Sequence, residues 1–238
     1  VRVIPNGTEG EVMVVKESET KGVKFKNWNE FDGPLTTLRI NVWYLEDFIA
    51  YKQDASSKEQ FDLEPAFKMR DLRFALNGRL KFKRDITWKA GLMYDTKSYK
   101  WAFRETGILV AVPELSGHIF AGRTKEAFSM EKIMVGYAIW GMERPMITDL
   151  IPILADGVKW LGYLPKQRIL WNIGFFDDFL SKNQSFSTYN WQSSARIGWL
   201  PVYSETGKKV LSLAVEARYG RTKNDEIQIR SRPEAYSA

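Results

Sequence analysis

Apolar and polar side chains alternate along most of the chain after the first 35 residues, with the period of two that is typical of β-strands. The clearest example is the segment 210–221, in which Leu213 and Val215 fall on one face and Glu216 and Arg218 on the other. The same alternation predicts further strands at 38–44, 73–82, 86–95, 168–176 and 191–201.

Short polar segments separate these strands, at 83–85, 95–98, 116–117 and 205–208. Neighbouring strands joined by short turns form an antiparallel meander, and we expect about nine or ten strands in this chain. Two segments, 100–113 and 116–123, show no clean alternation. The sequence therefore leaves open which way Arg104 and Arg123 point.

The pattern divides the chain into a lead-in over residues 1–35 and a β-sheet domain over residues 36–238. Within the second part, residues 128–156 have no sustained period. A stretch of this length without regular structure is usually functional or disordered. Its apolar and aromatic content favours a packed loop.

Two all-β architectures alternate in this way, a soluble sandwich with a dry core and a transmembrane barrel whose apolar face meets lipid. The predicted strands reach about ten residues, against about five or six in soluble sheets. Trp191 and Trp199 mark the two ends of one apolar face. They lie about 27 Å apart along a strand, or about 20 Å after tilting, close to the roughly 25 Å apolar band between aromatic girdles. These features favour an antiparallel transmembrane β-barrel.

The composition is compatible with such a barrel, and the net positive charge favours an anionic partner. The mean hydropathy is only −0.34, and aromatic residues make up 14% of the chain. The formal charge of +6 and the pI of about 9.3 indicate an anionic partner. The chain has no cysteine and a single histidine, His118, which excludes a disulfide framework and disfavours a metal site. We expect no cofactor.

Short motifs in the second half of the chain are similar to those of a known family. The sequence GRTKEAFSME at 122–131 resembles the strand end and following loop of the phosphate-selective porin O and P family. That family usually shows a glycine, a polar residue, Lys, Glu-Pro-Phe and then Glu. Ala127 replaces the usual proline. The sequences MERP at 142–145 and RSRPEA at 230–235, and the strand pair at 157–178, also resemble it.

The resemblance, which runs loosely from Thr36 to the end, implies a bacterial outer-membrane porin with sixteen strands, usually a homotrimer. It implies a water-filled, anion-selective channel for phosphate or polyphosphate, narrowed by an inward loop and surrounded by lipid and lipopolysaccharide. The chain matches roughly the N-terminal half of such a porin, and we expect the full protein to continue past Ala238.

Basic side chains on the predicted polar faces are the candidate pore-lining and anion-binding residues. Rings of arginine or lysine select anions, because guanidinium and ammonium groups bind oxyanions and repel cations. A solvated outer face or ordinary pairing, as between Glu216 and Arg218, would also explain single positions. The candidates are Arg73, Arg79, Lys81, Lys89, Arg168, Arg196 and Arg218.

Three charged residues of the long loop, Lys132, Glu143 and Arg144, are candidates for the channel constriction, or for a salt bridge that pins the loop to the wall. No catalytic constellation is visible, so we do not expect an enzyme. The alternative to a porin is a soluble or surface β-sheet protein that binds anionic glycans or nucleic acid. The porin interpretation itself involves no nucleic acid.

Overall fold

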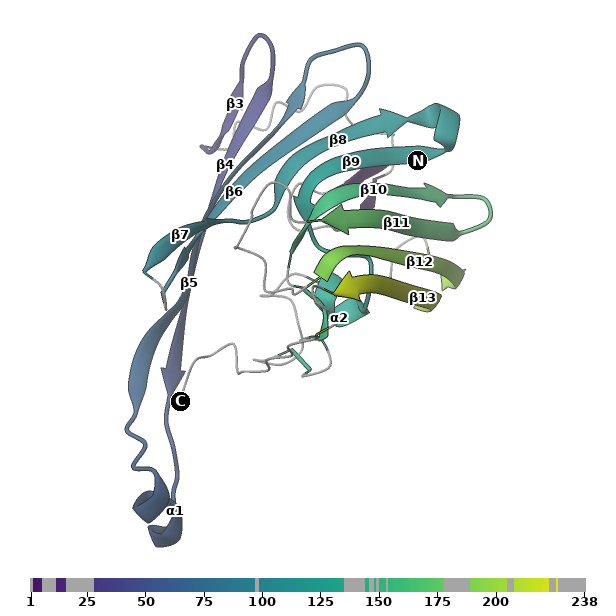
Figure 1. The fold of residues 1–238 in the computed structure, drawn as a ribbon. Helices are drawn as coiled ribbons and strands as arrows, with labels where there is room; N and C mark the ends of the chain where they lie inside the picture. The colour runs from purple at the N-terminus through teal and green to yellow at the C-terminus, as the bar shows by residue number, and fades with distance from the viewer. Residues whose placement is uncertain are drawn as a thin grey trace.

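The computed structural model describes residues 2–5, 12–15, 28–96, 99–134, 144–145, 148, 150–152, 154–177, 189–204, 208–222 and 226. Most of them belong to one 11-stranded sheet, in which neighbouring strands run antiparallel (Figure 1). The predicted all-β antiparallel meander is confirmed. The sheet is open, because β3 at one edge and β13 at the other do not pair with each other.

Strand order follows the chain with one exception, since β7 and β8 both pair with β6. The strands of the main sheet are β3 (Glu30–Asp32), β4 (Thr37–Ile49), β5 (Ala66–Leu80), β6 (Ile86–Asp95), β7 (Lys100–Phe103), β8 (Thr106–Val112), β9 (Gly117–Thr124), β10 (Ala155–Leu164), β11 (Ile169–Asp177), β12 (Tyr189–Tyr203) and β13 (Val210–Thr222).

The remaining elements are small. A separate two-stranded sheet is formed by β1 (Arg2–Pro5) and β2 (Val12–Val15), within the predicted lead-in, whereas β3 from the same lead-in joins the main sheet. The short helices are α1 (Ala55–Gln60), η1 (Pro113–Leu115) and α2 (Met130–Ile133). The β4–β5 hairpin, with α1 near its tip, projects well beyond the other strands (Figure 1).

The sheet has an exposed apolar face and a polar face that is buried where the chain covers it. On β10–β13, exposed apolar side chains include Val158, Ile173, Phe175, Ile197 and Val215, with exposed fractions between 39% and 78%. This burial is the reverse of a soluble sandwich, whose apolar faces pack together in a dry core.

The alternating residues of the same strands form the polar face. Gln192, Ser194 and Arg196 of β12 are at most 7% exposed, and Lys159 of β10 is equally buried. The register places Lys159, Gly174 and Ser194 in one row across β10, β11 and β12. The alternate residues of these strands therefore form one shared surface.

Aromatic side chains of the apolar face gather toward both ends of the strands. Toward the short turns lie Trp88, Trp160, Trp171 and Trp199, and the rings of Trp160 and Trp171 are 5.2 Å apart. At the other end, Trp191 contacts the rings of Phe175 and Tyr219 at 5.7 and 5.5 Å. A second group at that end comprises Phe74, Tyr94 and Trp101.

A β-bulge explains why alternation failed near residue 104. Leu92 pairs with Phe103, and Lys89 pairs with Gly107, so two residues of β6 face the three residues 104–106. The extra residue shifts the phase of β7 relative to β8, and no single period can fit both.

Candidate functional site

The chain leaves β9 and immediately crosses the polar face. Gly122 has a φ of 140°, a conformation that L side chains rarely adopt. Residues 125–134, which end in α2 and which we call the covering segment, contact the polar face of β10, β12 and β13. Lys125 and Glu126 are 5% and 1% exposed, which makes the start of this segment among the most buried parts of the described chain.

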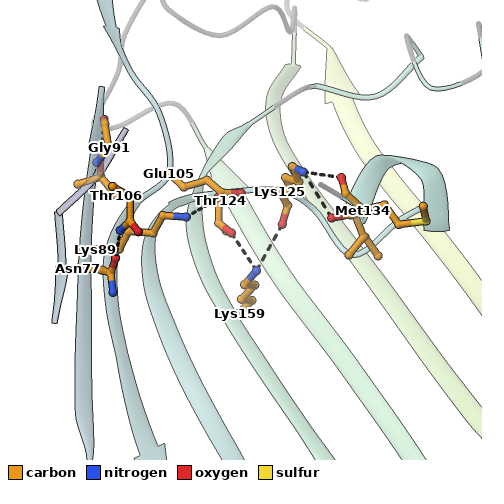
Figure 2. A network of polar contacts seen from close by, with 11 residues as sticks. Asn77, Lys89, Gly91, Glu105, Thr106, Thr124, Lys125, Met134 and Lys159 are labelled. Atoms are coloured by element: carbon orange, nitrogen blue, oxygen red, sulfur yellow. Dashed lines mark hydrogen bonds and ion pairs between the residues drawn. The ribbon is translucent and has the colours of Figure 1, made fainter. Parts of the chain in front are cut away.

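Three lysines from different parts of the chain gather near one carboxylate (Figure 2). Lys89 of β6 donates to Glu105 at 2.5 Å, and Lys159 of β10 donates to the Thr124 hydroxyl at 2.9 Å. Lys125 donates to the main-chain oxygen of Met134 at 2.9 Å. We call Lys89, Lys125 and Lys159 the lysine cluster.

Around Glu105, the positive charges of the lysine cluster outnumber the negative charge of the carboxylate. Glu105 interacts electrostatically with Lys89, Lys125 and Arg104, and Lys159 interacts with Glu105 in turn. Lys159 also lies 5.2 Å from the centre of the Phe120 ring, a cation–π distance. A buried excess of cations on a polar surface can attract a small anion.

Arginines on β12 and β13 are closely paired with carboxylates. Arg196 meets Glu216 at 3.1 Å, and Arg218 donates to Glu126 at 2.7 Å. Arg218 also donates to Gln192 at 2.7 Å. Burial raises the pKa of the Glu126 carboxyl, and the hydrogen bond from Arg218 acts against that rise.

Three further candidates lie on or beside β5, and each has a carboxylate partner. Arg79 meets Asp85 at 2.8 Å with both side chains about half exposed, while Lys81 lies just past the end of β5. The partners of Arg73 and Lys81 are Asp71 and Asp32. The candidates predicted from sequence are therefore mostly neutralised by neighbouring acids.

Arg168 requires a correction, because it does not lie on the polar face of a strand. It precedes β11, in the turn after β10, with a φ of 57° and an exposed side chain. Its guanidinium donates to the Pro201 oxygen at 3.2 Å. The turn requires a left-handed backbone conformation at Arg168. Extending the alternation of β11 backwards by one residue could not reveal this turn.

The basic residues that the structure describes in the long loop donate hydrogen bonds to main-chain oxygens. Lys132 of α2 is buried and donates to the Thr148 oxygen at 3.0 Å. Arg144 donates to the oxygens of Glu131 and Met134 at 3.1 and 3.3 Å, so it fastens the loop to α2. Glu143 lies outside the described residues.

A buried ion pair lies at the neck of this loop, where the end of β9 and the start of β10 come together. Thr124 pairs with Ala155, and beside them Arg123 meets Asp156 at 3.1 Å with side chains 5% and 0% exposed. Arg123 also donates to the Phe103 oxygen at 3.2 Å. The Arg123 side chain, whose direction the sequence left open, therefore points toward Asp156.

Sequence reasoning missed Lys125, Lys159, Glu105 and Glu126. Lys159 alternates with Val158 and Trp160, so the β10 pattern could have revealed it. The other three lie at a bulge or in a non-periodic segment, where alternation carries no information.

Within the described parts of the chain, no group of histidine, cysteine, aspartate or glutamate could hold a metal ion. Among the same residues, no helix is long and apolar enough to cross a membrane. Comparison with known protein families, curated proteins and solved structures finds no match to this chain.

Proposed function

We propose that this protein is a bacterial outer-membrane porin that forms a water-filled, anion-selective channel. The observation that carries the proposal is the inverted sheet, with large apolar side chains exposed and charged side chains buried under the chain's own loop. Lipid suits the first face and an aqueous lumen the second. The aromatic groups toward both strand ends fit the two interfaces of a membrane.

We further propose that the sheet closes into a barrel. Lipid tolerates no exposed strand edge, so the free edges of β3 and β13 require further strands between them. A sixteen-stranded barrel, assembled as a homotrimer among lipid and lipopolysaccharide, follows the resemblance to phosphate-selective porins. Closure would enclose the polar face and the covering segment.

Anion selectivity follows from the charge on the polar face. The lysine cluster brings more cations than carboxylates together, next to the segment that crosses the face. Fixed positive charge along a narrow passage concentrates small inorganic anions and repels cations. Phosphate-like ions are the solutes that we propose.

Adjacent residues on β13 offer a matched test of which face meets lipid. Ala214 belongs to the polar face and Val215 to the apolar face, and both are exposed. Because the chain has no cysteine, Ala214→Cys and Val215→Cys each introduce a unique thiol. In lipid vesicles, we expect a charged maleimide to label Ala214→Cys much faster than Val215→Cys, because lipid excludes charged groups. Equal labelling of the two thiols would favour a soluble sheet protein instead.

Tryptophan fluorescence gives an independent prediction. Trp88, Trp171, Trp191 and Trp199 lie on the apolar face toward the strand ends, so their indoles should reach the membrane interfaces. Lipids brominated near the headgroup should quench the emission of the reconstituted protein strongly. Quenching by soluble acrylamide alone, together with solubility without detergent, would contradict the membrane location.

A further inference from the structure

The covering segment is fastened to the far wall of the sheet by a buried ion pair. Glu126 lies next to the end of β9, whereas Arg218 lies on β13, 92 residues later. Their 2.7 Å contact joins side chains that are 1% and 11% exposed. A buried pair of this kind is costly to break, because each partner would leave a buried charge behind.

Two neighbouring contacts follow the same route. The amide of Ser129 donates to Glu216 at 2.6 Å, and Arg196 donates to the Met130 sulfur at 3.4 Å. Arg196 and Glu216 are themselves paired. The covering segment is thus attached to β12 and β13 at three successive points, and Glu126 makes the most buried of these contacts.

This attachment lies next to Lys125, the member of the lysine cluster that is not on a strand. Lys125 precedes Glu126 directly, and its ammonium group points back to the oxygens of Ile133 and Met134 in and beside α2 (Figure 2). The Lys125 oxygen also lies 3.5 Å from the ammonium group of Lys159. A shift of Glu126 away from β13 would therefore move Lys125 relative to Lys159.

We propose that Glu126 and Arg218 are positioning residues that anchor the covering segment and thereby hold Lys125 in the lysine cluster. Arg218 then supplies no free charge to passing anions, because Glu126 occupies its guanidinium. The expected effect on ion selectivity rests on the proposed channel function. The attachment of the covering segment does not depend on conduction.

Opposite charge changes separate an anchor from a free pore charge. Glu126→Gln adds one positive charge to the face, and Arg218→Gln removes one. If these groups acted as free charges, the reversal potential in a salt gradient would shift in opposite directions. If they act as anchors, both variants release the segment, so both should increase conductance and lower the anion-to-cation permeability ratio.

Two companion variants complete the experiment. Exchanging the charges, in Glu126→Arg with Arg218→Glu, should restore the wild-type permeability ratio by re-forming the pair. Glu114→Gln makes the same charge change as Glu126→Gln at an exposed pair with Arg84, and it should leave conductance unchanged. Shifts of opposite sign for the single variants would overturn the proposal.

Limited trypsin digestion tests the anchor without any channel measurement. Lys125 and Lys132 are each 5% exposed, so the folded wild type should resist cleavage at both sites. Glu126→Gln and Arg218→Gln should each lose this protection, and the exchanged pair should regain it. Unchanged protection in both single variants would refute the anchor, even if the wild type failed to conduct, which would refute the channel alone.

Discussion

Replacing Asp156 by alanine should destabilise the protein by about 3–5 kcal/mol, the usual cost of stripping one partner from a buried ion pair. The Asp156 side chain is fully buried and meets Arg123 at 3.1 Å. Its loss would leave the Arg123 guanidinium buried beside the neck of the long loop. Urea unfolding of the detergent-solubilised protein, followed by tryptophan fluorescence, should show the change as a lower midpoint.

Asp85→Ala provides the control for this prediction. Asp85 also pairs with an arginine, Arg79, at 2.8 Å, but these side chains are 41% and 54% exposed. Exposed pairs contribute about 0–1 kcal/mol, so the midpoint should hardly move. Equal destabilisation by the two variants would show that the Arg123–Asp156 pair has no special role at the neck.

Lys159→Gln should cause the largest loss of anion preference among single lysine substitutions. Lys159 carries a buried positive charge within the lysine cluster, and glutamine can keep a hydrogen bond to the Thr124 hydroxyl. Unit charges about 4 Å apart interact by about 1 kcal/mol even in water, roughly a fivefold change in local anion concentration. We therefore expect the anion-to-cation permeability ratio to fall by about fivefold.

Lys208→Gln is the matched control, because Lys208 lies exposed in the turn before β13. Its charge is well solvated and screened by salt over about 10 Å at 0.1 M, so its removal should change the ratio little. Both variants are compared by their reversal potentials in the same gradient. Equal shifts would remove the lysine cluster as the source of selectivity.

The strands could be predicted because each contributes its own local pattern. Ile173 and Phe175 alternate with Asn172 and Gly174, and pleat geometry alone assigns them to opposite faces. β6 was predicted with the bounds that the structure shows. The pattern does not say which face is covered, however, and only the structure shows the apolar face exposed.

Pairing between distant residues could not be predicted. The sequence suggested Arg218 as a lumen charge, because nothing local connects it to Glu126, which lies 92 residues earlier. Similarly, the bulge at 104–106 conceals the direction of the Glu105 side chain. In β9, the apolar Phe120 lies in the same row as Lys159, and this hides the alternation of that strand. Such contacts depend on the tertiary path of the chain rather than on its period.

The reversal potential of the wild-type protein in a planar bilayer tests the central claim most directly. With a tenfold gradient of potassium chloride across the membrane, we expect discrete conducting steps and a reversal potential with the sign of the chloride equilibrium potential. Replacing chloride by phosphate should preserve that sign. A reversal potential with the sign of the potassium equilibrium potential, or a reconstituted protein that never conducts, would contradict an anion-selective channel.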